Sequence, residues 1–270
     1  MSVAVDNAGT TSVVVDTVKA ERIKLTSTQS PWWCTVVIVA LGLGLAAILG
    51  AASKASMSVD EEVGRFYPTV DVAVSGVAGF GVLVLMILAA LSVTSEYRFG
   101  VIRTTFQAMP NRSAVLVVKA LLIGVFGAVL TGVLALASFY LAKALAGPEA
   151  GRDLVLEGDD AWRSIYGVAI YALLCAVLAV AVGALLRQSA GTIALLLLLW
   201  PLLIESLFAL FGSFGRQVQP FLPFANANHF LGSEQGIDFH WGPWGSLVYF
   251  AVFVAVVFAA ALVVVNRRDA

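Results

Sequence analysis

Charged residues, cysteine and histidine are all scarce in this sequence, and each shortage excludes a class of protein. Only 12% of the 270 residues are charged, against about 25% in soluble domains, and 60% are hydrophobic. Two cysteines do not make a disulfide framework. The two histidines, His229 and His240, have a spacing that zinc sites do not use. A net charge of −1 provides no basic surface for nucleic acid. We therefore predict an integral membrane protein with no metal site and no nucleic-acid partner.

Signatures of catalytic sites are missing as well. No lysine follows a glycine, so the G-x-x-x-x-G-K-[ST] loop that binds nucleotide phosphates cannot form. No apolar stretch contains an H-E-x-x-H pattern, and Ser189 and Ser206 have no histidine nearby in sequence. We predict no catalytic residues and no cofactor bound by this chain. Any ATP-driven activity would need ATP and magnesium on a separate subunit.

Six apolar stretches are long enough to cross a bilayer as helices. About 20 residues are needed to span roughly 30 Å of hydrocarbon. The stretches are residues 32–53, 71–93, 114–142, 164–186, 192–211 and 244–265. The third is longer than a span requires, so it should tilt or project beyond the bilayer. We predict an all-α membrane domain over residues 32–270, preceded by a polar segment over residues 1–31.

The positions of the cations favour one orientation, because cytoplasmic segments are enriched in Lys and Arg. With both termini in the cytoplasm, ten of the 16 Lys and Arg fall on the cytoplasmic side: Lys19, Arg22, Lys24, Arg98, Arg103, Arg112, Lys119, Arg187, Arg267 and Arg268. The opposite side carries acidic residues such as Asp60, Glu157 and Asp160. The sequence therefore predicts an N-in, C-in topology.

A short polar segment between the second and third stretches predicts an amphipathic helix over residues 97–109. As a helix, it places one group of apolar side chains together and turns the polar ones largely away. The apolar group is Val101, Ile102, Phe106 and Met109, and the polar group is Arg98, Arg103, Thr104 and Thr105. Pro110 ends the helix. Two interpretations are open: a surface on which a soluble partner docks, or a helix whose arginines bind anionic lipid headgroups.

The N-terminal 31 residues predict a mobile tail followed by a helix at the membrane surface. Residues 1–16 are rich in Val, Thr and Ser and should be mobile. Lys19, Arg22 and Lys24 are interspersed with apolar residues just before Trp32 and Trp33, which suits an interfacial helix with an aromatic anchor. Its role is either topogenic or mechanical.

Glu205 is the one acidic residue in the middle of a predicted span, so it is a functional candidate. Together with Ser206 it contributes to the substrate path or a subunit interface, or else it is a structural acid bonded to Ser206, a backbone carbonyl or a neighbouring helix. Residues 212–243 form the last loop, in which prolines interrupt aromatic residues. This loop is either a pair of half-helices re-entering the membrane or an aromatic loop at the interface.

Four segments resemble permease subunits of the ABC-2 class of ABC transporters, as found in actinobacteria. EYRFGVIRTTFQAMPNR (96–112) is similar to the E-Y-R-x-G-x-I-R-T-T…P-x-R stretch of that family, with Val101 where threonine is frequent. ERIKLTSTQSPWW (21–33) resembles the E-x-x-K-L…W-W stretch at the start of the family's sequences. LWPLLIESLF (199–208) and LPFANA (222–227) fit in position and order.

The resemblance implies a cytoplasmic connecting helix, a coupling helix after the second span and re-entrant helices before the sixth. It assigns ATPase coupling to Glu96, Tyr97, Arg98, Gly100, Val101, Ile102, Arg103, Thr104, Thr105 and Phe106. It assigns Glu21, Lys24, Trp32 and Trp33 to the connecting helix. The implied assembly holds two permease copies and two ATPase subunits in a bacterial cell membrane, and it exports drugs, lipids or polysaccharides.

Two other classes remain open from the residues alone. One is an immunity protein that sequesters a peptide or lipid without ATP. The other is a secondary carrier, although the spans hold one mid-membrane acid and no repeated pair of broken helices. An associated ATPase distinguishes the exporter, and coupling to a proton gradient alone distinguishes the carrier.

Overall fold

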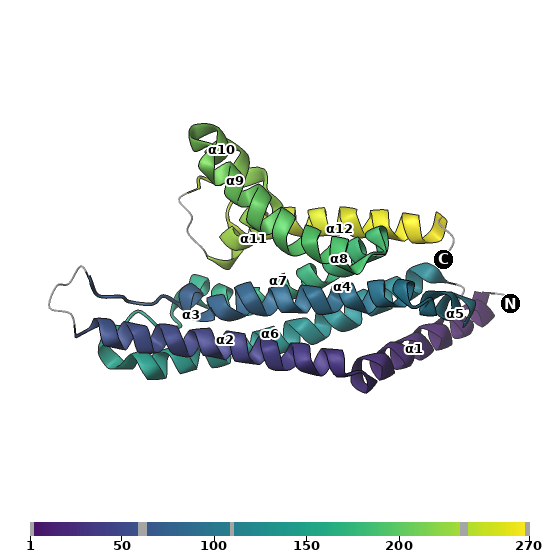
Figure 1. The fold of residues 1–270 in the computed structure, drawn as a ribbon, viewed down its shortest axis with the longest axis horizontal. Helices are drawn as coiled ribbons and strands as arrows, with labels where there is room; N and C mark the ends of the chain where they lie inside the picture. The colour runs from purple at the N-terminus through teal and green to yellow at the C-terminus, as the bar shows by residue number, and fades with distance from the viewer. Residues whose placement is uncertain (1–2, 59–63, 109–110, 233–236, 268–270) are drawn as a thin grey trace.

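The computed structural model describes residues 3–58, 64–108, 111–232 and 237–267, and every regular element in these ranges is a helix (Figure 1). In chain order the elements are α1 (Val3–Ser27), α2 (Gln29–Ser56), α3 (Val70–Gly76), the π-helix η2 (Val77–Gly81), α4 (Val82–Arg98), α5 (Val101–Ala108), α6 (Arg112–Ala150), α7 (Gly158–Leu186), α8 (Ser189–Ile193), the π-helix η3 (Ala194–Ile204), α9 (Glu205–Leu210), α10 (Gly212–Val218), the 3-10 helix η4 (Gln219–Phe221), α11 (Pro223–Leu231) and α12 (Pro243–Arg267). The all-helical prediction is confirmed for these residues.

Five helices are long and apolar enough to cross a membrane, which indicates a multi-pass membrane protein. They are α2, the continuous α3–η2–α4 helix, α6, α7 and α12, and they contain 25 to 39 residues. At 1.5 Å per residue even the shortest exceeds roughly 30 Å of hydrocarbon. The other predicted span, residues 192–211, corresponds to α8, η3 and α9, which follow one another without a gap and end at Leu210; half of their residues are π-helical. Pro201 lies inside η3 and lacks the N–H that a regular α-helix uses there.

Helix α6 is the longest element, as predicted from the length of the third stretch. Its 39 residues are interrupted at Gly147, whose φ of 75° and ψ of −176° are not helical. Pro148 follows directly, so the chain kinks where proline cannot continue the hydrogen-bond ladder. The regular helix is therefore broken at Gly147, and α7 begins at Gly158.

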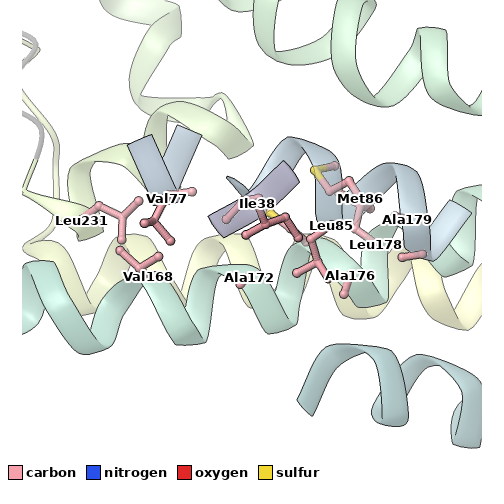
Figure 2. Packing of buried hydrophobic residues seen from close by; sticks show 14 of the residues in the cluster. Ile38, Val77, Leu85, Met86, Val168, Ala172, Ala176, Leu178, Ala179 and Leu231 are labelled. Atoms are coloured by element: carbon pink, nitrogen blue, oxygen red, sulfur yellow. The ribbon is translucent and has the colours of Figure 1, made fainter. Parts of the chain in front are cut away.

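The core forms around α7, which packs against α4, α6 and α12. Figure 2 shows Leu85 and Met86 of α4 lying close to Ala176 and Leu178 of α7. Small side chains let helix backbones approach closely, which is how helices associate in lipid. The contact between α2 and α6 shows the limit of this approach: a Cβ on Gly50 would lie 2.6 Å from the backbone oxygen of Ala142.

The polar elements gather at one end of the molecule. Figure 1 shows both chain termini and α5 at that end, whereas α3 and α11 lie toward the other end. Helix α1 begins at Val3, so the structure has a helix where a mobile tail over residues 1–16 was predicted. No proline interrupts the α1 sequence, which allows the helix to extend that far. Thr28, with φ −98° and ψ 149°, separates α1 from α2.

Candidate functional site

The candidate site is the junction of α4 and α5 with the helices around it. The junction depends on Gly100, whose φ of 71° lies in the left-handed region that favours glycine. The predicted helix over residues 97–109 is therefore divided: Glu96, Tyr97 and Arg98 complete α4, and α5 begins only at Val101. The division lets α5 change direction after α4, so the side of α5 that packs on the protein does not continue the buried side of α4.

Helix α5 has one face on the protein and one face exposed. Ile102 is 6% exposed, and the guanidinium of Arg112 lies 5.2 Å from the centre of the half-buried Phe106 ring. Arg103 and Thr104 are exposed, as predicted. Val101 is 43% exposed, so it does not share the buried side of Ile102 as its predicted grouping with that residue implied; it lies beside Gly100 at the start of the helix.

Two further predictions for this segment have different outcomes. Thr105 is half-buried rather than turned away, and its Oγ1 donates to the backbone oxygen of Val101 at 3.2 Å. Met109 and Pro110 lie outside the described residues. The exposed surface of the junction is thus made by Arg98, Phe99, Val101, Arg103 and Thr104.

A cluster of four charged side chains, which we call the charge cluster, joins this junction to α1 and α6. Lys119 Nζ of α6 donates to Glu21 Oε2 at 2.5 Å and to Glu96 Oε1 at 2.9 Å. Lys24 Nζ donates to Glu21 Oε1 and to Glu96 Oε1, both at 2.8 Å. The four charges sum to zero. The predicted coupling residue Glu96 and the predicted connecting-helix residues Glu21 and Lys24 are therefore in direct contact.

The cluster is largely removed from solvent. Lys119, Glu21 and Glu96 are 3%, 4% and 7% exposed. Burial alone would raise the pKa of Glu21, but the charge of Lys119 and the hydrogen bonds from both lysines outweigh it and hold that pKa below its ordinary value. Burial likewise opposes the charge on Lys24, yet the hydrogen bonds to Glu21 and Glu96 raise its pKa. Glu21 and Lys24, which lie outside the spans, are thus both held in their charged forms.

The buried carboxylate of Glu96 is stabilised by the hydrogen bonds of Lys24 and Lys119. Its Oε1 accepts from both, while its Oε2 is buried without a hydrogen-bond partner among the described residues. An acidic side chain at the C-terminal end of a helix is also disfavoured by the helix dipole. The position of Glu96 at the end of α4 is therefore stabilised mainly by α1 and α6.

The end of α4 also contacts the elements that follow α6. The guanidinium of Arg187, at the end of α7, lies 4.7 Å from the centre of the Tyr97 ring. Ser189 Oγ of α8 donates to Thr94 Oγ1 at 2.8 Å, and Thr94 is fully buried. The last turns of α4 therefore bind α1, α6, α7 and α8. A displacement of α5 would act on all four through this one helix end.

Beside the charge cluster lies a cavity of about 470 Å³. Its polar side includes Glu21, Lys24, Glu96 and Arg98, and its apolar side includes Leu88 and other residues of α4 and α6. Trp32 and Trp33 lie near it at the start of α2 and are 65% and 67% exposed. Their exposure fits the predicted anchoring of α2 by aromatic residues at an interface.

Glu205 lies apart from the charge cluster, at the start of α9. Its Oε1 accepts from the backbone N–H of Phe224 at 2.8 Å, near the N-terminus of α11. Glu205 thus contacts a neighbouring helix, which was one of the structural alternatives. The group that it binds is a backbone N–H and not a backbone carbonyl. The side chain of Ser206 lies outside the described residues.

The loop before α12 contains short helices. The predicted pair corresponds to α10 and α11, joined by η4, and α11 buries Phe224, Phe230 and Leu231 against the core. His229 Nδ1 lies 2.8 Å from Ser246 Oγ and its ring stacks on Phe239, while the ring of the next residue, His240, lies against Phe221.

Sequence reasoning assigned Lys119 to the cytoplasmic cations and not to the site. The signal that identifies it is a lysine within an otherwise apolar span, because such a charge is stable only when it is paired. Thr94, Arg187 and Ser189 carried no comparable signal, since short polar side chains and interfacial arginines are common near span ends.

No family model matches this chain, and no curated protein matches it.

Proposed function

We propose that this chain is the membrane-spanning permease subunit of an ATP-driven exporter, with the exposed surface of the α4–α5 junction as the docking site for a separate ATPase. One observation carries the proposal: the junction presents a short exposed helix whose base is joined by buried charges to α1 and α6. A partner that pushes on α5 would move the end of α4 together with the helices it binds. Because the chain lacks a phosphate-binding loop, the ATP and magnesium belong to the partner.

The proposed arrangement has six spans, with α8, η3 and α9 as the fifth, and α10 and α11 as re-entrant helices. Both termini and α5 are placed in the cytoplasm of a bacterial cell. Two permease copies, identical or related, pair with two ATPase subunits, and the cargo is amphipathic or lipophilic. The distribution of cations and the common end of α5 and both termini support this orientation (Figure 1).

The test is co-purification of the tagged full-length chain from its own host in mild detergent. The wild-type chain should co-elute with a nucleotide-binding protein whose ATP hydrolysis it stimulates. Phe99→Asp and Val101→Asp alter side chains that are 73% and 43% exposed at the junction. Each should remove about 2 kcal/mol, or roughly thirtyfold in affinity, from the interface.

The matched control is Phe66→Asp, because Phe66 is 37% exposed in the connection before α3, at the end of the molecule away from α5 (Figure 1). It should leave association and stimulated hydrolysis unchanged. Equal co-elution of the wild type and both junction variants would show that an ATPase docks elsewhere or not at all.

A further inference from the structure

A second cavity, of about 280 Å³, lies in the half of the molecule away from α5 and is independent of the charge cluster. Its walls come from α3, η2, α4, α7, η3, α9 and α11. Both π-helices contribute, with Ala78 and Gly79 from η2 and Pro201 from η3. π-helical turns are rare and recur at functional sites, so their meeting at one cavity indicates a binding role.

The lining combines negative charge with apolar surface. Asp71 and Glu205 both line the cavity, and its described lining includes no lysine, arginine or histidine. Tyr171 and Phe224 supply aromatic rings, and most other lining side chains are aliphatic or small. Ligand cavities typically have this composition, mostly apolar with a few polar groups that set specificity.

Both carboxylates accept hydrogen bonds from groups that carry no formal charge. Glu205 Oε1 accepts from the backbone N–H of Phe224, and Asp71 Oδ1 accepts from Thr69 Oγ1. Within the described part of the chain, neither carboxylate has a salt-bridge partner. A carboxylate that has no charged partner attracts cations, so a cation that enters the cavity is stabilised by both.

The cavity continues to an acidic outer cavity. Asp71 and Ser164 line both the inner cavity and a neighbouring one of about 630 Å³. The outer cavity is also lined by Asp153, Glu157 and Asp160. A concave surface lined by charges of one sign raises the local concentration of ions of the opposite sign.

The basic residues of the outer cavity offset this charge only in part. Arg163 pairs with Asp160 and donates to the backbone oxygen of Phe230. Burial, and then the charge of Arg163, lower the pKa of His229 below its ordinary 6.5, so its ring is neutral at pH 7. The carboxylates of Asp71 and Glu157 keep the entrance negative.

We propose that the inner cavity binds a monovalent organic cation, an ammonium or phosphonium ion with apolar substituents. The two carboxylates match its charge, and the aromatic and aliphatic lining matches its substituents. A neutral molecule of the same shape leaves the carboxylates desolvated, and an anion is repelled. The role of this cation as the cargo rests on the proposed export function. Binding of the cation to the cavity needs no ATPase.

The test is equilibrium binding of radiolabelled benzyltrimethylammonium, which is smaller than the cavity, to the purified full-length chain in detergent, with its neutral carbon analogue neopentylbenzene as competitor. Binding should be saturable and resist the neutral competitor. Glu205→Gln and Asp71→Asn each remove one charge while keeping the oxygen that accepts the hydrogen bond. Each should weaken binding at least about tenfold, since opposite charges at contact interact strongly in a partly desolvated site.

Asp159→Asn is the matched control, because Asp159 is an exposed acid in the first turn of α7 outside both cavities. Its affinity should equal that of the wild type. Asp71→Asn keeps the test valid if the Glu205 variant misfolds, because Asp71 lies in the first turn of α3 and is partly exposed, so that its substitution disturbs the fold less. Wild-type affinity in both cavity variants, or equal binding of the neutral competitor, overturns the proposal. If the chain binds the cation but no ATPase, only the proposed exporter function is contradicted. If it binds an ATPase but not the cation, only the proposed cation site is contradicted.

Discussion

Lys119 lies near the start of α6, and its ammonium group is bound by two carboxylates from other helices. Glu96 in turn has hydrogen bonds through one oxygen only, and both of its donors are lysines. Among the described residues, removing Lys119 leaves Lys24 as the remaining salt-bridge partner of both carboxylates, and Lys24 is itself partly exposed. Buried ion pairs are weak sources of net stability, but removal of one partner is strongly destabilising because the other charge stays buried.

We therefore expect Lys119→Met to lower the free energy of unfolding by about 3–5 kcal/mol. The measurement is the unfolding transition of the purified chain in detergent. Lys143→Met is the control, because Lys143 lies on the same helix with its side chain exposed. It should change stability by about 0.5 kcal/mol or less. Similar transitions for the two variants would show that the charge cluster is not a structural requirement.

At the scale of elements, α1 and α4 are held together by charge more than by apolar contact. Glu21 and Lys24 lie one turn apart on α1 and bridge to Glu96 and Lys119. Because titratable side chains make this contact between α1 and α4, its strength depends on pH.

We expect α1 to stay docked at neutral pH and to separate in acid. The folded pKa of Glu21 is below its ordinary 4.5, so its stabilisation is complete above pH 4.5 and is lost as pH falls through the lower folded value. The pKa of Lys24 is raised above 10.5, so its stabilisation is complete below pH 10.5 and is lost as pH rises through the folded value.

The measurement is the distance between spin labels on Arg22 of α1 and Gln107 of α5, both exposed, as a function of pH. Asp16→Asn should respond to pH as the wild type does, since Asp16 is an exposed acid on the same helix. Glu21→Gln should show a smaller acid-induced change. An unchanged acid response in the Glu21 variant would assign the titration to another group.

At the scale of the whole molecule, α5 lies at the same end as both chain termini (Figure 1). In the proposed orientation, which the distribution of Lys and Arg favours, this end is in the cytoplasm. The outer cavity, with its acidic residues, then opens on the other side of the membrane in this proposal.

Cysteine labelling tests this orientation in a chain from which Cys34 and Cys175 have been removed. With a membrane-impermeant maleimide on intact cells, Asp159→Cys should react, and Thr104→Cys should react only after permeabilisation. Both positions are exposed, so access to the reagent depends on the side of the membrane. Labelling of Thr104→Cys in intact cells would contradict the proposed docking of a cytoplasmic ATPase.

The all-helical class and the positions of five long helices followed from the sequence, because apolar length is a local property that bilayer thickness makes decisive. The exposed Arg103 and the buried Ile102 also followed from helical period. The helix over residues 3–16 was not predicted, because Val, Thr and Ser are weak helix formers, and the break at Gly100 was not predicted because it depends on one backbone angle.

Only the tertiary structure decided which charges meet. Glu21 and Lys119 are 98 residues apart, and Glu205 reaches the backbone of Phe224 across 19 residues. Periodicity places a side chain on a face of its own helix, but the partner depends on the rotation and depth at which two helices pack. The residue types that require partners were therefore visible in the sequence, and their pairing became visible only in the fold.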